Sequence, residues 1–383
     1  MSKNFKNILI WAMDRADVKA PQLAKKMHVK ENLIGKWINE EATPTFSQIC
    51  RLAKALYIPL GYFYLSEPPE EKLPINDFRS INNKSVGEMS PDLKSVLYDA
   101  MRKRDWYSDW RKTEGFNKLE FVGQYKVENG VDFVADAIEQ ILELEPEFYK
   151  KHRNWQESLS RLAEKAENAG IIVLQSGVVE NNTSRKLKVS EFRGFALVDE
   201  YAPIIFVNSA DSNAARIFTL IHEIAHILLG ESGIIDANYE SDDLSPMQME
   251  LFCNKVAAEV LVPSDDFVKD WNPDFVTVDL IEALASKYKI GAQVILRKAL
   301  DLGLVEKQYF FFLLQEVKKQ EKPIKGSKGN YYRSFFARNS KTLTKDITIA
   351  VMNGRVSYHD GAQLLNTKAK TFNTIFNKML EGV

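Results

Sequence analysis

Two histidines and a glutamate lie close together in the middle of the chain, in the order His222-Glu223-Ile-Ala-His226. In a helix, His222 and His226 lie one turn apart on the same face, so both imidazole rings can bind one Zn²⁺. Glu223 then lies beside the metal and can accept a proton from the water that the metal activates. The residue types and their spacing therefore predict a hydrolytic zinc site with Glu223 as the catalytic carboxylate.

The residues around this motif favour a helix of matching length. Positions 217–229 are mostly apolar, Asp211 or Ser212 can cap the start, and Gly230 can end the helix. Histidine is scarce in the rest of the chain, which holds only three more. This setting favours a chemical role for the motif over a chance occurrence.

A catalytic zinc ion needs a third protein ligand and one position left for water. Six residues after the second histidine, where one class of zinc peptidases has a third histidine, the chain has Ser232. The ligand must therefore come from elsewhere. The acidic residues that follow are Glu231, Glu240, Asp242, Asp243, Glu250 and Glu259. The first four lie in a polar loop, where a ligand would be poorly held.

Glu250 and Glu259 both fall on the next predicted helix, residues 247–262. Nine residues at about 100° each place them on opposite faces, so at most one can face the metal. The face of Glu250 also carries Asn254 and Ala257, which suit close packing against a metal site. Asn254 could orient a ligand histidine by a hydrogen bond. We therefore favour Glu250 as the third ligand, with Glu259 as the alternative.

The N-terminal region predicts five short helices over residues 4–65, without a strand. Apolar spacing over residues 22–38 is typical of two helices that cross at a tight turn, as in a helix-turn-helix motif. Residues 1–65 carry ten Lys or Arg against five Asp or Glu, so duplex DNA is the expected partner. The side chains expected to contact DNA are Lys30, Glu31, Asn32, Lys36 and Asn39. A module that contacts only protein is the alternative.

Length and composition bound the rest. The chain has 383 residues, 45% hydrophobic and 27% charged, which predicts several globular domains. The longest apolar runs are far too short to cross a bilayer, and the first twenty residues show no export signal. Two cysteines cannot form a disulfide framework. We expect a cytoplasmic protein with no membrane partner.

The order of patterns along the chain predicts four segments. They are a helix-turn-helix domain (1–66), a linker and helical connector (67–150), a metal-binding domain (151–317) and a basic helical C-terminal segment (318–383). Strand patterns at 170–174, 192–198 and 203–208 lie among helices, which indicates an α+β domain with a small sheet. A second helix-turn-helix-like pattern at 280–297 favours packing over DNA contact. The aromatic residues of the tail favour a small helical core over single-stranded nucleic-acid binding.

The metal motif and its surroundings resemble the ImmA/IrrE family of zinc-dependent peptidases over roughly residues 150–310. The stretches that match in order are Arg193-Gly194-Phe195-Ala196, 203–208, 215–219, 222–226 and 250–263. In the last of these, Cys253 and Val256 stand where the family pattern has Ala and Phe. The resemblance implies a multidomain chain. Its parts would be an all-α five-helix DNA-binding domain, an α+β zincin-like peptidase domain and a small helical tail domain.

Residues 1–65 are similar to the repressor-like family of DNA-binding domains. The positions that match are Leu23-Ala24, Val29, Ile34, Trp37, Pro44 and Leu52-Ala53. Where a Glu-x-Gly commonly follows the Trp, this chain has Ile38-Asn39-Glu40, so we expect the tight glycine turn to be lost. The branch of the peptidase family with this attached domain is also similar through Asp77-Phe78-Arg79, which implies an ordered interdomain contact.

The two resemblances together imply regulated proteolysis. The expected function is a zinc-dependent endopeptidase and transcriptional regulator that cleaves a partner protein, either a repressor, an antitoxin or a toxin. The strand near 195–198 could be an edge to which an extended peptide adds. A homodimer is also open. The alternative function is a DNA-binding regulator or antitoxin without proteolysis, in which the peptidase fold is only a scaffold.

Overall fold

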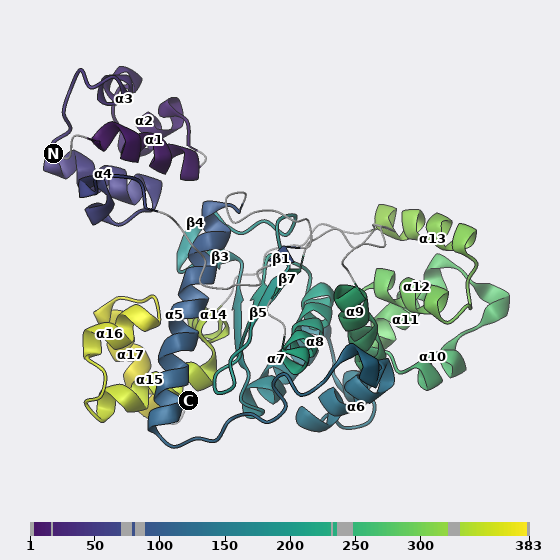
Figure 1. The fold of residues 1–383 in the computed structure, drawn as a ribbon. Helices are drawn as coiled ribbons and strands as arrows, with labels where there is room; N and C mark the ends of the chain where they lie inside the picture. The colour runs from purple at the N-terminus through teal and green to yellow at the C-terminus, as the bar shows by residue number, and fades with distance from the viewer. Residues whose placement is uncertain are drawn as a thin grey trace. The chain divides into compact units, whose positions relative to one another are not determined.

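The computed structural model describes residues 4–16, 18–69, 79–80, 89–230, 233–235, 248–320 and 330–380. The chain divides into two compact units. The first holds residues 1–76 and 84–97, and the second holds residues 77–83 and 98–383. The whole is helix-rich with a small sheet, which fits the expected α+β domain (Figure 1). Among the described helices, none has the length and apolar character to span a bilayer.

The first unit begins with a bundle of short helices. They are α1 (Phe5–Arg15), α2 (Ala20–Met27), α3 (Glu31–Ile38), α4 (Phe46–Leu56) and the 3₁₀ helix η1 (Leu60–Tyr64). The fifth predicted helix is thus a 3₁₀ helix. Leu23, Ile34, Trp37 and Leu52 lie fully buried in one core, because each helix carries apolar residues on a single face. Thr45 caps α4 by accepting a hydrogen bond from the Gln48 backbone N–H.

The turn after α3 corrects one expectation from the sequence. Glu40 adopts φ of 63°, in the left-handed region that favours glycine. The tight turn is therefore kept, although Glu40 stands at the position where the family pattern has glycine. A side chain in this region costs about 1 kcal/mol.

The second unit is built on a five-stranded sheet of order β1-β7-β5-β6-β2. The strands are β1 (Arg79–Ser80), β2 (Ile172–Ser176), β5 (Gly194–Leu197), β6 (Ile204–Asn208) and β7 (Gly233–Ile235). β5 is antiparallel to β6 on one side and to β7 on the other. The prediction that the strand near 195–198 forms a free edge is therefore wrong. A hairpin of β3 (Val178–Val179) and β4 (Asn182–Lys186) stands beside this sheet.

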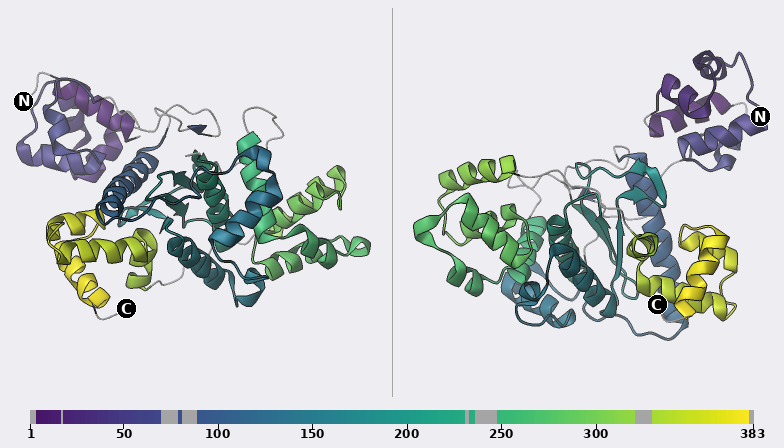
Figure 2. Two further views of the ribbon diagram at one scale, coloured as in Figure 1. Left: turned by 60° about the horizontal axis from the view of Figure 1, so that its bottom comes forward. Right: turned by 180° about the vertical axis from the view of Figure 1, so that it is seen from behind.

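Helices cover both faces of the sheet (Figures 1 and 2). α7 (Trp155–Asn168) and α8 (Asn213–Leu229) lie on one face, with α6 (Val131–Ile141) and α9 (Gln248–Leu261) packed beyond α8. Residues 98–113 of α5 (Pro91–Thr113) lie on the other face with α14 (Tyr331–Asn339). Ala196, Ile205 and Val207 point into a core shared with α8. This packing fixes α8 against the sheet.

Further helices extend the second unit at both ends. α10 (Ser264–Asp270), η5 (Pro273–Phe275), α11 (Val278–Tyr288), α12 (Ala292–Asp301) and α13 (Lys307–Gln320) follow α9, and η3 (Val127–Asn129) and η4 (Phe148–Lys151) flank α6. Ile281 and Leu296, from the second helix-turn-helix-like pattern, are buried in the core of this unit.

The C-terminal helices pack on the sheet and on α5. They are α14, α15 (Lys341–Met352), α16 (Tyr358–Leu364) and α17 (Ala369–Leu380). Phe335 and Phe372 are buried among them, whereas Tyr331 is half exposed. The tail aromatics thus contribute a helical core, as the sequence favoured.

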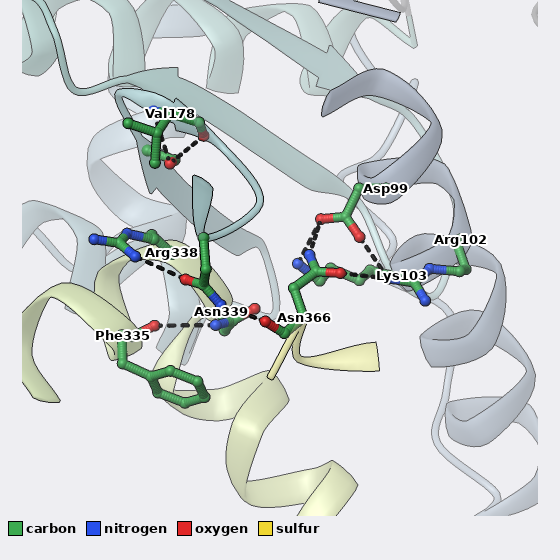
Figure 3. A network of polar contacts seen from close by, with 10 residues as sticks. Asp99, Arg102, Lys103, Val178, Phe335, Arg338, Asn339 and Asn366 are labelled. Carbon is green, nitrogen blue, oxygen red and sulfur yellow. Dashed lines mark hydrogen bonds and ion pairs between the residues drawn. The ribbon is translucent and has the colours of Figure 1, made fainter. Parts of the chain in front are cut away.

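Polar contacts join the tail to the rest of the second unit (Figure 3). Asp99 on α5 accepts hydrogen bonds from Lys103 at 2.7 Å and from the Asn366 side chain at 2.8 Å. Asn181, in the β3–β4 turn, accepts one from Arg338 at 2.7 Å and donates one to the Asn366 carbonyl. Because Lys103 is almost fully buried, Asp99 is the counter-charge that makes its burial tolerable.

Candidate metal centre

Helix α8 carries the His-Glu-x-x-His motif on a well-defined frame. The Ser212 side chain caps its start by accepting a hydrogen bond from the Ala215 N–H at 3.1 Å. Gly230 ends it in the left-handed conformation, with φ of 76°. The N–H of Gly123 donates to the Ile227 carbonyl at 3.0 Å, so a preceding loop satisfies the last turn. The sequence predicted both ends of this helix.

The imidazole rings of α8 converge with one carboxylate from α9. Nε2 of His222 and Nε2 of His226 lie 2.9 Å apart. Glu250 places Oε2 at 3.1 Å from Nε2 of His222 and Oε1 at 3.3 Å from Nε2 of His226. These three residues form a group that could hold a metal ion. Ligand atoms around one tetrahedral zinc ion lie about 3.3 Å apart, so the donor set fits such an ion.

The structure places Glu259 away from this group. Its carboxylate accepts hydrogen bonds from the backbone N–H of Ser264 at 2.8 Å and from the Ser264 hydroxyl at 2.7 Å. It also pairs with Lys298, which is buried. Glu259 therefore holds α10 and α12 together. Of the other acidic candidates, Glu231, Glu240, Asp242 and Asp243 lie outside the described residues.

Glu223 lies fully buried between α8 and the sheet. Neither of its carboxylate oxygens has a hydrogen-bond partner among the described residues. Burial raises the pKa of Glu223 well above its usual range. An unpaired buried carboxyl group is costly and points to a task that needs its oxygens free.

The charges of the group respond to burial and to one another. Burial tends to raise the pKa of Glu250, but hydrogen bonds from both histidines outweigh this effect and lower the pKa. Burial lowers the pKa of His222. Burial also opposes protonation of His226, but Cys253 and Glu250 outweigh it and raise the pKa of His226 well above its usual range. The three side chains thus compete for protons at the atoms where a cation would bind.

Two neighbours on α9 touch the histidine rings. Asn254 favours the protonated form of the His222 ring, but Nδ1 of that ring has no hydrogen-bond partner among the described residues. Asn254 therefore lies beside the His222 ring, and its role in orienting that ring stays a prediction. Cys253 is buried against His226. The sequence did not predict this contact with His226, because Cys253 was considered only as a replacement for the alanine of the family pattern.

Gly194 is a second residue whose place the sequence did not reveal. A methyl group at this position would lie 2.5 Å from Cγ2 of Thr219 and 3.2 Å from Oε1 of Glu223. Only glycine lets the start of β5 approach α8 so closely. A glycine inside a strand pattern is the signal that could have suggested it.

The side chains expected to contact DNA lie together on the first unit. Lys30 precedes α3 and Asn39 follows it. The set of Lys30, Glu31, Asn32, Lys36 and Asn39 is exposed throughout. The Asp77-Phe78-Arg79 contact lies largely outside the described residues, apart from the backbone of Arg79 in β1.

The part of the chain that carries this potential metal-binding group is similar to a known peptidase family. Residues 166–300 match a peptidase family described as the IrrE N-terminal-like domain. This range contains α8, α9 and the three potential ligands. Residues 339–378, most of the helical tail, match a domain of unknown function, DUF8813. No curated protein matches the chain.

Proposed function

We propose that this chain is a zinc-dependent endopeptidase that cuts a protein partner, and that its first unit binds DNA. The observation that carries the peptidase proposal is the convergence of His222, His226 and Glu250 next to the buried, unpaired carboxyl group of Glu223. The match of residues 166–300 to a peptidase family supports it.

The ligands suit zinc because two imidazoles and one carboxylate leave a fourth position for water. When bound, Zn²⁺ lowers the pKa of water and polarises a carbonyl group. Glu223 accepts a proton from the attacking water and passes it to the amine that leaves, so it acts first as base and then as acid. Its burial keeps other hydrogen-bond donors away from both oxygens.

The partner is proposed to be a repressor, antitoxin or toxin, because a DNA-binding unit and a peptidase in one chain link proteolysis to gene control. Exposed Lys30, Lys36 and Asn39 on and beside α3 support contact with a DNA duplex through phosphates and base edges. A cytoplasmic location belongs to the same proposal.

The test is co-expression of the full chain with regulators and toxins encoded beside its gene. Mass spectrometry should find fragments of one neighbour cut at a defined bond. Chelation should abolish the cutting, and added Zn²⁺ should restore it. If no neighbour is cut while the chain still binds DNA after zinc removal, the non-proteolytic regulator is the better account.

A further inference from the structure

Strand β7 pairs with one edge of β5, the strand that begins beside the candidate metal centre. Three residue pairs join the two strands in antiparallel register, namely Gly194 with Ile235, Phe195 with Ile234 and Ala196 with Gly233. Extended peptides bind proteins by pairing with such a strand edge through main-chain hydrogen bonds. β7 therefore occupies the main-chain groups of β5 that an added peptide would use.

This side of β5 begins beside the carboxylate of Glu223. Gly194 is the first residue of β5, and a methyl group on it would lie 3.2 Å from Oε1 of Glu223. Ile235 is the register partner of Gly194. An extended chain that paired with β5 in place of β7 would thus run past Gly194, whose backbone lies close to the Glu223 carboxylate.

The outer side of β7 is held by β1. Arg79 pairs with Gly233 and Ser80 with Ile234, in parallel register. β1 lies within residues 77–83, which belong to the second unit but connect the two stretches of the first unit, 1–76 and 84–97. The strand that secures β7 is thus linked by the chain to the unit proposed to bind DNA. At the opposite side of the sheet, α14 packs against β2.

We propose that β7 is an internal inhibitory strand, which an extended segment of the protein substrate replaces on β5. The inference rests on the peptidase function proposed above and names the form of its substrate. Such a substrate is recognised as an unfolded stretch of polypeptide, because main-chain pairing needs an extended backbone. Exchange is feasible because β7 holds β5 by only three residue pairs and short strands pair weakly.

The test measures binding of fluorescently labelled β-casein, an unstructured protein, to the full chain carrying Glu223→Gln, in which cutting is silenced. Adding Ile234→Pro removes a backbone donor from β7. It should tighten casein binding about tenfold, which is about 1.4 kcal/mol. Adding Ile234→Ala keeps the backbone donor and should leave the binding unchanged. Equal or weaker binding with Ile234→Pro overturns the inference.

A second variant guards against misfolding. Ser80→Pro weakens the pairing of β1 with the outer side of β7 and changes no residue of β7 or of the metal centre. It should therefore loosen β7 and also tighten casein binding, by a smaller factor. Both proline variants should keep the metal content of the parent chain. If they bind casein more tightly but no variant with Glu223 intact cuts it, the peptidase proposal fails, and only the replacement of β7 by an extended polypeptide stands. If the wild type cuts casein and neither proline variant binds or cuts it better, the inhibitory strand fails alone.

Discussion

At the scale of single residues, the assignment of the third ligand rests on helical periodicity. Glu250 and Glu259 are nine residues apart on α9 and turn to opposite sides. One meets the histidines, and the other meets Ser264 and Lys298. The sequence could rank these two residues because α9 is a regular helix. It could not place Gly194 and Cys253, because their contacts depend on how closely α8 approaches β5 and α9.

Replacing each glutamate by alanine should separate the two roles. Glu250→Ala should lose most of the bound Zn²⁺, because it removes one of three ligands. Glu259→Ala should keep about one Zn²⁺ per chain but destabilise the fold by about 3 kcal/mol, since Lys298 stays buried without its partner. Elemental analysis and urea unfolding measure the two effects. Zinc retained in Glu250→Ala and lost in Glu259→Ala would refute the ligand assignment.

At the scale of secondary-structure elements, the regular helices were predictable and the sheet was only partly so. α8 matches the predicted helix because its caps and its apolar residues are encoded locally. β1 and β7 could not be predicted. They are two and three residues long, too short for an alternating pattern, and they pair with strands far away in the sequence. The free edge expected at β5 was wrong for this reason.

The contacts of α5 with the tail predict a stability that depends on pH. Burial opposes ionisation of Asp99, but Lys103 and Arg102 outweigh it and lower its pKa. Asp99→Asn should therefore cost about 3 kcal/mol near pH 7, because it leaves Lys103 buried without a counter-charge. A lowered pKa stabilises the fold fully above the unfolded value, which is about 4, and the effect fades as the pH falls through the folded value.

Urea unfolding at pH 7 and near pH 3 measures this difference between wild type and variant. The difference should be smaller at the lower pH. Asp105→Asn is the matched control, because Asp105 lies on the same helix and its side chain is exposed. It should change stability by less than about 0.5 kcal/mol at either pH. An Asp99→Asn effect that is absent at pH 7, or that grows on acidification, contradicts the role given to Asp99.

At the scale of the whole molecule, the chain divides into two compact units, and the four segments that the sequence predicted stay a prediction. Residues 98–383 gather in one unit, in which the tail packs on the sheet and on α5. The sequence could not show this gathering, because it depends on contacts such as Asn181 with Arg338 that join distant parts of the chain.

The first unit should give the full chain a salt-dependent affinity for duplex DNA. Removing one lysine that neutralises a phosphate lowers the slope of log affinity against log salt by about 0.9. Changing both Lys30 and Lys36 to alanine should therefore reduce the slope by about 2. Lys54 is an exposed lysine of α4. Lys54→Ala is the control, because it removes the same charge as each of the other two substitutions. Affinity that does not vary between about 50 and 200 mM salt in the wild type would favour a protein-contact module.

The central claim is that Glu223 performs proton transfer at a zinc centre without binding the metal. The most direct measurement is cleavage of the identified partner by Glu223→Gln at full zinc occupancy, with His222→Ala as the reference that loses both metal and activity. We predict that Glu223→Gln keeps about one Zn²⁺ per chain and its thermal stability, while cleavage falls by at least about 100-fold. Undiminished cleavage by zinc-loaded Glu223→Gln would contradict the account.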